Sequence, residues 1–290
     1  MGLALILASA ALAAHDPSED RSVKLDLVAR LTTSPETIVL GSSRGRRAQP
    51  DYIESLTGHS AFNGAVRAGT AADAFVMTRY LADCAPRAGR RYIWFVDAGL
   101  ATNGIPPELL ADPRSHGYLG LPGALSRQAL CRPRGRPDGR HQADGSYTAQ
   151  VASSLPEHAK NLDAEVAKLV ASVREHHGSL NLDTNPRRFV WFEKTLAFMN
   201  SHGSRPVIVF NPIQPKVLAE LRKYGFPEHR AALTYLRGLH RRYDFVAVDA
   251  ENIHRWGGSA NDFWDPTHID YANMRRLLAY IVAHSDGALR

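Results

Sequence analysis

The fold is decided by the stretch Thr37-Ile38-Val39-Leu40-Gly41-Ser42-Ser43-Arg44-Gly45, in which a threonine and three apolar residues are followed by a glycine and two serines. A short apolar run that stops at turn residues is typical of a strand buried on both faces, as in a parallel sheet. Comparable runs lie at Tyr92 to Val96, Val207 to Phe210 and Phe245 to Val248, and a weaker one lies at Ala61-Phe62-Asn63. The sequence therefore predicts five strands.

Helical patterns lie between these runs. From Glu157 to His177, apolar residues recur at helical spacing with charged residues on the opposite side. The other predicted helices are Ala71 to Cys84, Pro186 to Asn200, Pro215 to Lys223, Pro227 to Arg242 and Ile269 to Ala283. Strands that alternate with helices predict an α/β fold with a doubly wound, mostly parallel sheet covered on both faces.

Composition excludes several classes of protein. The chain has 290 residues, of which 44% are apolar and 22% charged, so it is neither disordered, collagen-like nor a multi-spanning membrane protein. Its net charge is +6, but the excess comes from scattered arginines with no long basic run, so we expect no nucleic-acid partner. Two cysteines, Cys84 and Cys131, exclude a disulfide scaffold and a four-cysteine zinc site.

One long segment does not fit the strand–helix alternation. About 110 residues separate Val96 from Val207, more than one crossover helix requires. Between Asp112 and Ser146 the composition shifts to Arg, Pro, Gly and His, with too few apolar residues for a separate core. We interpret residues 101–185 as an insertion in a single domain of residues 23–290.

The first 22 residues resemble a signal peptide or a truncated membrane anchor. Gly2 to Ala14 is apolar all round but shorter than the ~20 residues that span a bilayer, and no basic segment precedes it. A buried N-terminal helix of a cytosolic protein is the alternative. We favour export, hence an extracytoplasmic protein, either secreted or associated with the membrane through its N-terminus. Export would allow Cys84 and Cys131 to pair, although the sequence alone does not establish a disulfide.

The candidate catalytic residues follow predicted strands. In an open α/β sheet, ligands bind outside the carboxyl ends of the strands. Ser43 follows the first strand, and Asp265-Pro266-Thr267-His268 precedes the last helix. A serine becomes nucleophilic when an imidazole accepts its proton, and a carboxylate orients that imidazole. The pattern therefore predicts Ser43 as nucleophile, His268 as base and Asp265 as orienting acid.

Each of these segments also has a purely structural interpretation. Gly41 to Gly45 is compatible with an ordinary turn. Asp265 followed by Pro266 is compatible with the start of the last helix, with Asp as N-cap and Pro in the first turn. Asn63 and Gly69 are compatible with turn residues. Asn211 would either end a strand or form part of the pocket wall.

The sequence resembles the SGNH (GDSL-like) hydrolase superfamily from about Thr37 to the C-terminus, and more narrowly its divergent bacterial extracytoplasmic branch. The residues that carry the resemblance are Gly41-Ser42-Ser43-Arg44 as first block, Asn63 to Thr70 as second block, and Asp265 with His268 as fifth block. The resemblance implies a three-layer α/β/α sandwich with a mostly parallel five-stranded sheet of flavodoxin-like type.

The resemblance also implies an activity. It makes Ser43 the nucleophile, and it places the amides of Ser43 and of Ala68 or Gly69 in an oxyanion hole, with Asn63 and Asn211 beside the substrate. The implied chemistry is hydrolysis or transfer of an acyl group, through an acyl-enzyme, on an acylated cell-envelope carbohydrate or a small ester. No metal or organic cofactor is implied, and the oligomeric state stays open.

The third block departs from the family pattern. The family carries Gly-x-Asn-Asp after the corresponding strand, whereas this chain has Asp97-Ala98-Gly99, so one oxyanion donor is unassigned. A catalytically inactive module that binds or scaffolds envelope polysaccharide is therefore the alternative function. The arginines of the insertion that would hold an anionic glycan or phosphate in that case are Arg114, Arg127, Arg132, Arg134, Arg136 and Arg140, and a solvated flexible loop is the other interpretation of this segment.

Overall fold

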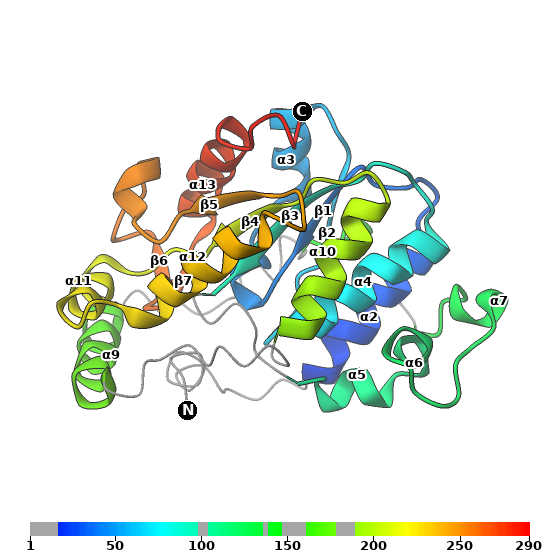
Figure 1. Ribbon diagram of the computed structural model, residues 1–290, viewed down its shortest axis with the longest axis horizontal. Coiled ribbons are helices and arrows are strands. Elements are labelled where there is room, and N and C mark those ends of the chain that lie inside the picture. The colour runs from blue at the N-terminus through cyan, green and yellow to red at the C-terminus, as the bar shows by residue number, and fades with distance from the viewer. Residues whose placement is uncertain (1–16, 98–103, 136–138, 147–160, 178–188) are drawn as a thin grey trace.

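The computed structural model describes residues 17–97, 104–135, 139–146, 161–177 and 189–290. Its centre is a five-stranded sheet with the order β2-β1-β3-β4-β5, and every pair of neighbouring strands is parallel (Figure 1). The strands are β1 (Thr37–Leu40), β2 (Ala61–Asn63), β3 (Arg91–Val96), β4 (Val207–Phe210) and β5 (Val246–Asp249). The predicted α/β fold is confirmed.

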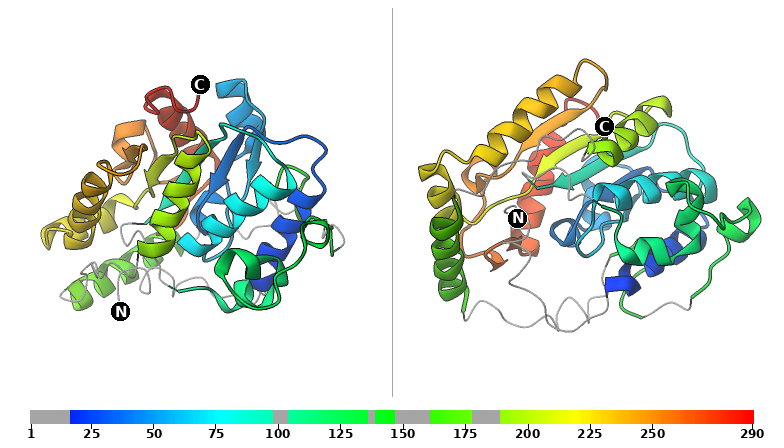
Figure 2. Two further views of the ribbon diagram at one scale, coloured as in Figure 1. Left: turned by 45° about the vertical axis from the view of Figure 1, so that its right-hand side comes forward. Right: turned by 60° about the horizontal axis from the view of Figure 1, so that its bottom comes forward.

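Helices cover both faces of the sheet and make a three-layer sandwich (Figures 1 and 2). One apolar core lies between one face and the helices α2 (Pro17–Ala29), α4 (Ala71–Cys84), α10 (Val190–Ser201) and α12 (Pro227–Leu239). The opposite core is closed by α3 (Pro50–Thr57) and α13 (Tyr271–Ala283). Alternate strand residues enter the two cores: Ile38 and Leu40 face the first, and Val39 faces the second.

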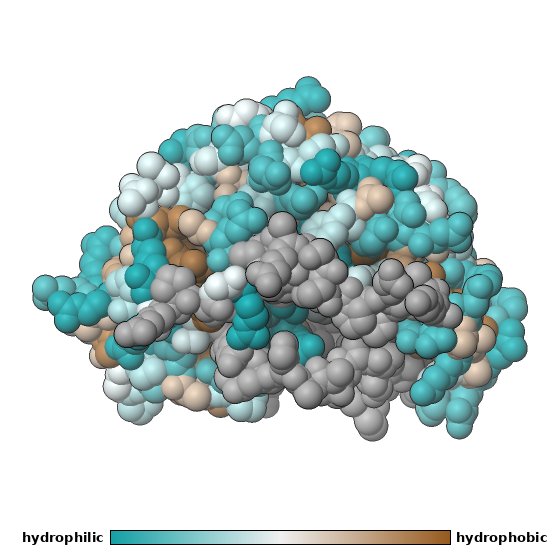
Figure 3. Space-filling view, turned by 180° about the vertical axis from the view of Figure 1, so that it is seen from behind, coloured by the Kyte–Doolittle hydropathy of each residue, from teal (hydrophilic) through white to brown (hydrophobic). Residues whose placement is uncertain are grey.

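A third, smaller core lies between α9 (Leu162–His176) and α11 (Pro215–Lys223), which pack against each other. The predicted helices over 157–177 and 186–200 correspond to α9 and α10, although residues 157–160 and 186–188 lie outside the described residues. Seen from behind, the described surface is mostly hydrophilic, with apolar residues in small scattered patches (Figure 3).

Before α9, the described part of the insertion contains three short helices that pack on the side of α2 and α4. They are α5 (Pro107–Ala111), α6 (Pro113–Leu119) and α7 (Arg127–Leu130). A disulfide between Cys84 and Cys131 joins the end of α4 to the end of α7. Arg114 is buried in ion pairs with Asp26 of α2 and with Asp112, which occupy its guanidinium. Arg114 is thus a structural residue, and its assignment to an anionic glycan was wrong.

The N-terminal prediction falls mostly outside the described residues, because residues 1–16 are not among them. Residues 17–22 of the predicted signal-like segment form the first turns of α2, whose Leu25 and Val28 are buried in the first core. Within the described ranges, no helix combines the length and the apolar character needed to cross a bilayer.

Removal of the disulfide tests how the insertion contributes to stability. In a variant with Cys84→Ser and Cys131→Ser, we expect the free energy of unfolding to fall by about 4 kcal/mol, because a cross-link across a loop of this length restricts the unfolded chain. Urea titration followed by circular dichroism measures the change. Reductant should destabilise the native protein by a similar amount and leave the variant unchanged. Equal midpoints for native protein and variant would contradict the prediction.

Candidate active site

The position of Ser43 follows from the way β1 ends. Gly41 has a φ of +139°, and a Cβ at this residue would lie 2.7 Å from the carbonyl oxygen of Phe95 on β3. Only glycine fits that approach without displacing the backbone. The chain then enters a 3₁₀ helix, η1 (Ser43–Gly45), of which Ser43 is the first residue. Ser43 therefore lies at the carboxyl edge of the sheet, as predicted from the strand pattern.

Asn63, at the end of β2, holds this turn in place through hydrogen bonds from its side chain. Its side-chain NH₂ donates to the backbone carbonyls of Gly45, Arg46 and Ala48, and its Oδ1 accepts from the amide of Ala65. Asn63 is fully buried, so the amide is committed to the protein itself. Among the candidate site residues, Asn63 thus has a positioning role for η1.

His268 and Asp265 come from a short antiparallel hairpin that precedes α13. The hairpin consists of β6 (Phe263–Asp265) and β7 (His268–Ile269), and β7 contacts η1. The predicted helix over 269–283 begins only at Tyr271, with Asp270 as its N-cap, because Ile269 pairs with Phe263. The interpretation of Asp265 as the N-cap of this helix was therefore wrong.

The hairpin brings together three side chains that are far apart in the sequence. Ser43 Oγ lies 2.8 Å from His268 Nε2, and His268 Nδ1 lies 2.7 Å from Asp265 Oδ2. With the Nδ1 proton directed at the carboxylate, the Nε2 lone pair faces the serine hydroxyl and accepts its hydrogen. The hydroxyl, the imidazole and the carboxylate thus form the hydrogen-bonded chain from which a serine nucleophile is activated.

The Asp265 carboxylate is held in its ionised form. Burial alone would raise its pKa, but hydrogen bonds from the His268 ring and from the amide and hydroxyl of Thr267 outweigh burial and hold the pKa well below its usual range. Oδ1 accepts from the amides of Thr267 and His268 and from the Thr267 hydroxyl. These bonds leave Oδ2 for the imidazole and fix the direction from which it approaches the ring.

Thr267 is a positioning residue that the sequence analysis missed. Its hydroxyl lies 2.8 Å from Asp265 Oδ1 and 3.0 Å from His268 Nδ1. The only signal in the sequence was its place between the acid and the base. A threonine between two polar residues is so common that this place identifies no role.

The loop after β2 contains the two backbone amides, of Ala68 and Gly69, that were predicted as oxyanion donors. The amide of Gly69 donates to the carbonyl of Val66, whereas the amide of Ala68 has no hydrogen-bond partner among the described residues. Ala68 has a φ of +48°, and its carbonyl accepts from Arg21. A Cβ on Gly69 would collide with the carbonyl of Gly41, so this loop lies directly against the turn that carries Ser43. Of the two predicted oxyanion donors, Ala68 is the one with an amide to offer.

A third polar group lies at the ends of β3 and β4. Asp97 Oδ1 is 2.8 Å from Arg44 Nη1 and accepts from the side-chain NH₂ of Asn211 at 3.0 Å. This network links the neighbour of Ser43 to the middle of the sheet. The NH₂ of Asn211 is therefore committed to Asp97, while its Oδ1 is buried with no hydrogen-bond partner among the described residues.

Comparison with known proteins adds nothing to this geometry. The chain matches no model of a known protein family, and no curated protein matches it. The function is therefore argued from the site itself.

The low pKa of Asp265 predicts how Asp265→Asn changes acid stability. The ionised carboxylate stabilises the fold above its unfolded-state pKa of about 3.9, and this contribution is lost as the pH falls toward the lower pKa of the folded state. At pH 7 we expect the variant to be about 1–3 kcal/mol less stable, as for loss of hydrogen bonds to a charged group. The deficit should shrink below pH 4.

Urea titrations of the native protein and the variant at pH 7, 5, 4 and 3 measure this deficit. Asp244→Asn is the matched control, since the Asp244 side chain is 71% exposed. A deficit that stays constant across the pH range would contradict an ionised, hydrogen-bonded Asp265.

Proposed function

We propose that this chain is a serine esterase or O-acyltransferase of SGNH type that acts, through an acyl-enzyme, on acyl esters of cell-envelope carbohydrate. The observation that carries the proposal is the chain of hydrogen bonds from Ser43 Oγ through His268 to Asp265. The parallel strand order and the position of Ser43 at the carboxyl edge of the sheet also support the proposal, because ligands of open α/β sheets bind at that edge.

The proposed reaction begins with attack of Ser43 Oγ on the acyl carbonyl carbon. His268 Nε2 accepts the hydroxyl proton as the bond forms, and Asp265 stabilises the resulting imidazolium without taking the proton. The imidazolium then gives its proton to the departing alcohol oxygen, which leaves an acyl ester on Ser43. Water in the hydrolase, or a sugar hydroxyl in the transferase, repeats the steps in reverse with His268 as base.

Two backbone amides are the proposed donors to the oxyanion. Ser43 is the first residue of η1, where an amide has no partner within the helix, and Ala68 offers the second amide. Donors placed at the developing oxyanion are commonly worth ~10²–10³ in rate each. The family's third-block Asn has no counterpart after β3, where Asp97 pairs with Arg44 instead.

That difference favours the second candidate function, a non-catalytic SGNH-like module that binds envelope polysaccharide. A carboxylate at Asp97 offers no hydrogen to an oxyanion, and Arg44 is engaged by it. The ordered hydroxyl–imidazole–carboxylate chain weighs against this candidate, because a binding module has no need of an imidazole oriented by a carboxylate.

The disulfide supports the proposed extracytoplasmic location. Disulfides persist in secreted and periplasmic proteins and are rare in the cytosol, where thiols are kept reduced. Cys84 and Cys131 are paired, and the structure has no free cysteine in its described part.

Ser43→Ala tests the proposed nucleophile. We expect turnover of p-nitrophenyl acetate to fall by at least ~10³-fold in kcat, because the nucleophile and its proton path are both removed. A fluorophosphonate probe should label the native protein at one site and fail to label the variant, as read by intact mass.

Ser42→Ala is the matched control. Ser42 is the adjacent serine, and its side chain makes no capping hydrogen bond to η1, so labelling should persist in this variant. Labelling that survives in Ser43→Ala would exclude Ser43 as nucleophile. A native protein that binds acidic polysaccharide but shows neither labelling nor turnover would favour the non-catalytic module.

A further inference from the structure

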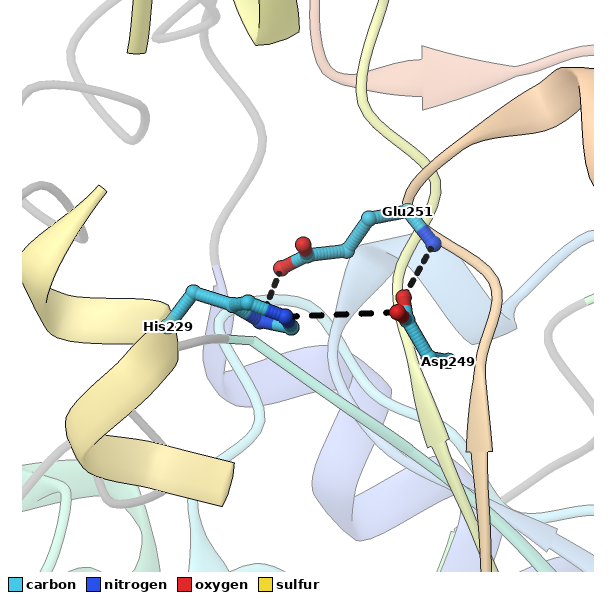
Figure 4. Close-up of side chains that lie close together, drawn as sticks. All are labelled: His229, Asp249 and Glu251. Atoms are coloured by element: carbon cyan, nitrogen blue, oxygen red, sulfur yellow. Dashed lines mark hydrogen bonds and ion pairs between the residues drawn. The ribbon is translucent and has the colours of Figure 1, made fainter. Parts of the chain in front are cut away.

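A second polar cluster lies at the carboxyl edge of the sheet, away from Ser43. His229, in the first turn of α12, faces Asp249 at the end of β5 and Glu251 just after it (Figure 4). One ligand atom from each of the three side chains lies within 4.8 Å of the other two. His229 Nδ1 is 2.9 Å from Glu251 Oε1, and Nε2 is 4.0 Å from Asp249 Oδ2.

Burial raises the pKa of the Glu251 carboxyl, and the contact with His229 Nδ1 partly offsets that rise, so the two groups are in direct polar contact. His229 Nδ1 is buried and has no hydrogen-bond partner in the described chain, although the Glu251 oxygen is within reach, so the angle between them is unfavourable. Buried polar atoms are nearly always paired, and an exception indicates a missing water or ion. A nitrogen and an oxygen that lie side by side at this distance are arranged as two ligands of one ion would be.

Two further buried oxygens, from segments next to the cluster, lack hydrogen-bond partners among the described residues. Glu228, which precedes His229, is 3% exposed, and its Oε2 has no hydrogen-bond partner among the described residues. Burial, together with the charges of Asp97 and Glu251, raises the pKa of the Glu228 carboxyl to about 7, so this carboxyl lies near Glu251. Asn211, with its unpaired Oδ1, follows Phe210, whose ring lies 5.3 Å from that of His229.

The cluster holds more negative than positive charge. Among the described arginines and lysines, Asp249 pairs with Arg255 at 2.9 Å, and Arg222 acts on Glu251 from farther away. Glu251 is 4% exposed and Glu228 is 3% exposed, and carboxylates buried to this extent require a nearby cation or a proton. A divalent cation would supply charge and ligand bonds together.

We propose that His229, Asp249 and Glu251 bind a divalent transition-metal cation, Zn²⁺ or Mn²⁺. Ligand atoms about 2.1 Å from one ion lie at most ~4.2 Å from each other, and one ligand atom from each of the three side chains already lies within 4.8 Å of the other two, so small side-chain rotations would close the site. His229 would use one ring nitrogen, because the contacts at 2.9 and 4.0 Å involve Nδ1 and Nε2, which cannot both bind the same ion. One imidazole with two carboxylates suits these ions better than Ca²⁺ or Mg²⁺, which prefer oxygen alone. Arg255 would remain on Asp249 as the outer partner that orients a ligand.

The site stands apart from the proposed esterase chemistry. It draws on β5 and α12, whereas Ser43 follows β1, and the described link between them is the Arg44–Asp97–Asn211 network. The ion would hold the start of α12 against the end of β5 and neutralise the buried carboxylates. Loss of metal binding therefore does not overturn Ser43 as nucleophile, and loss of labelling does not overturn the metal site.

Calorimetric titration of the chelator-treated full chain with ZnCl₂, MnCl₂ and CaCl₂ tests the site. We expect one equivalent of Zn²⁺ or Mn²⁺ to bind, with a rise in Tm, and Ca²⁺ to bind at least tenfold more weakly. His229→Gln, Asp249→Asn and Glu251→Gln should each weaken binding at least tenfold, since each removes or weakens a ligand. His202→Gln and Asp244→Asn change exposed residues elsewhere and should bind as the native chain does.

A spectroscopic readout avoids dependence on variants that unfold. Titration of the native chain into Mn²⁺ should abolish the electron paramagnetic resonance signal of the free aqua ion up to one equivalent, and Zn²⁺ should restore it. Absence of saturable binding, or equal affinity in His229→Gln and the native chain, would overturn the proposal. The cluster would then be a polar network in which the two ring nitrogens of His229 bridge two carboxylates.

Discussion

The close approach of Gly41 to β3 is the constraint on which the candidate site depends. A Cβ at residue 41 would lie 2.7 Å from the Phe95 carbonyl oxygen, so only glycine fits at the point where β1 ends and the chain turns. Gly69 lies against the carbonyl of Gly41 in the same way, and the amide of Val66 donates to that carbonyl. The loops after β1 and β2 are thus packed tightly against each other. This packing fixes the position of the backbone that carries the Ser43 hydroxyl.

A fixed hydroxyl is useful only if the imidazole is fixed as well. The hairpin before α13 provides this, because Asp265 accepts three hydrogen bonds from the turn that it begins and a fourth from the ring. The backbone amides of Thr267 and His268 therefore orient the carboxylate that orients the ring. Ser43 and His268 are 225 residues apart, yet neither relies on a flexible loop for its position.

The strands could be predicted from the sequence because buried parallel strands are rich in apolar residues. The strands β1, β2 and β4 begin and end at the residues that the sequence predicted. The β6–β7 hairpin could not be predicted, since Asp265 followed by Pro266 satisfies the rules for a helix start and the pairing of Phe263 with Ile269 is a tertiary choice. The role of Arg114 could not be predicted for a related reason. The sequence shows an arginine in the insertion but does not show that Asp26 and Asp112 pair with it in the folded protein.

The same limit explains why the His229 cluster escaped the sequence analysis. Metal-binding patterns are recognised by short spacings, whereas here the imidazole lies in the first turn of a helix and the carboxylates follow a strand some twenty residues later. The two polar sites at this edge of the sheet differ in the number of hydrogen-bond donors around their carboxylates. Asp265 is surrounded by hydrogen-bond donors that stabilise its charge, so it can orient a base. Burial and neighbouring negative charge raise the pKa of both Glu228 and Glu251, so a proton or a cation has to offset their charge, and the proposed ion would do so.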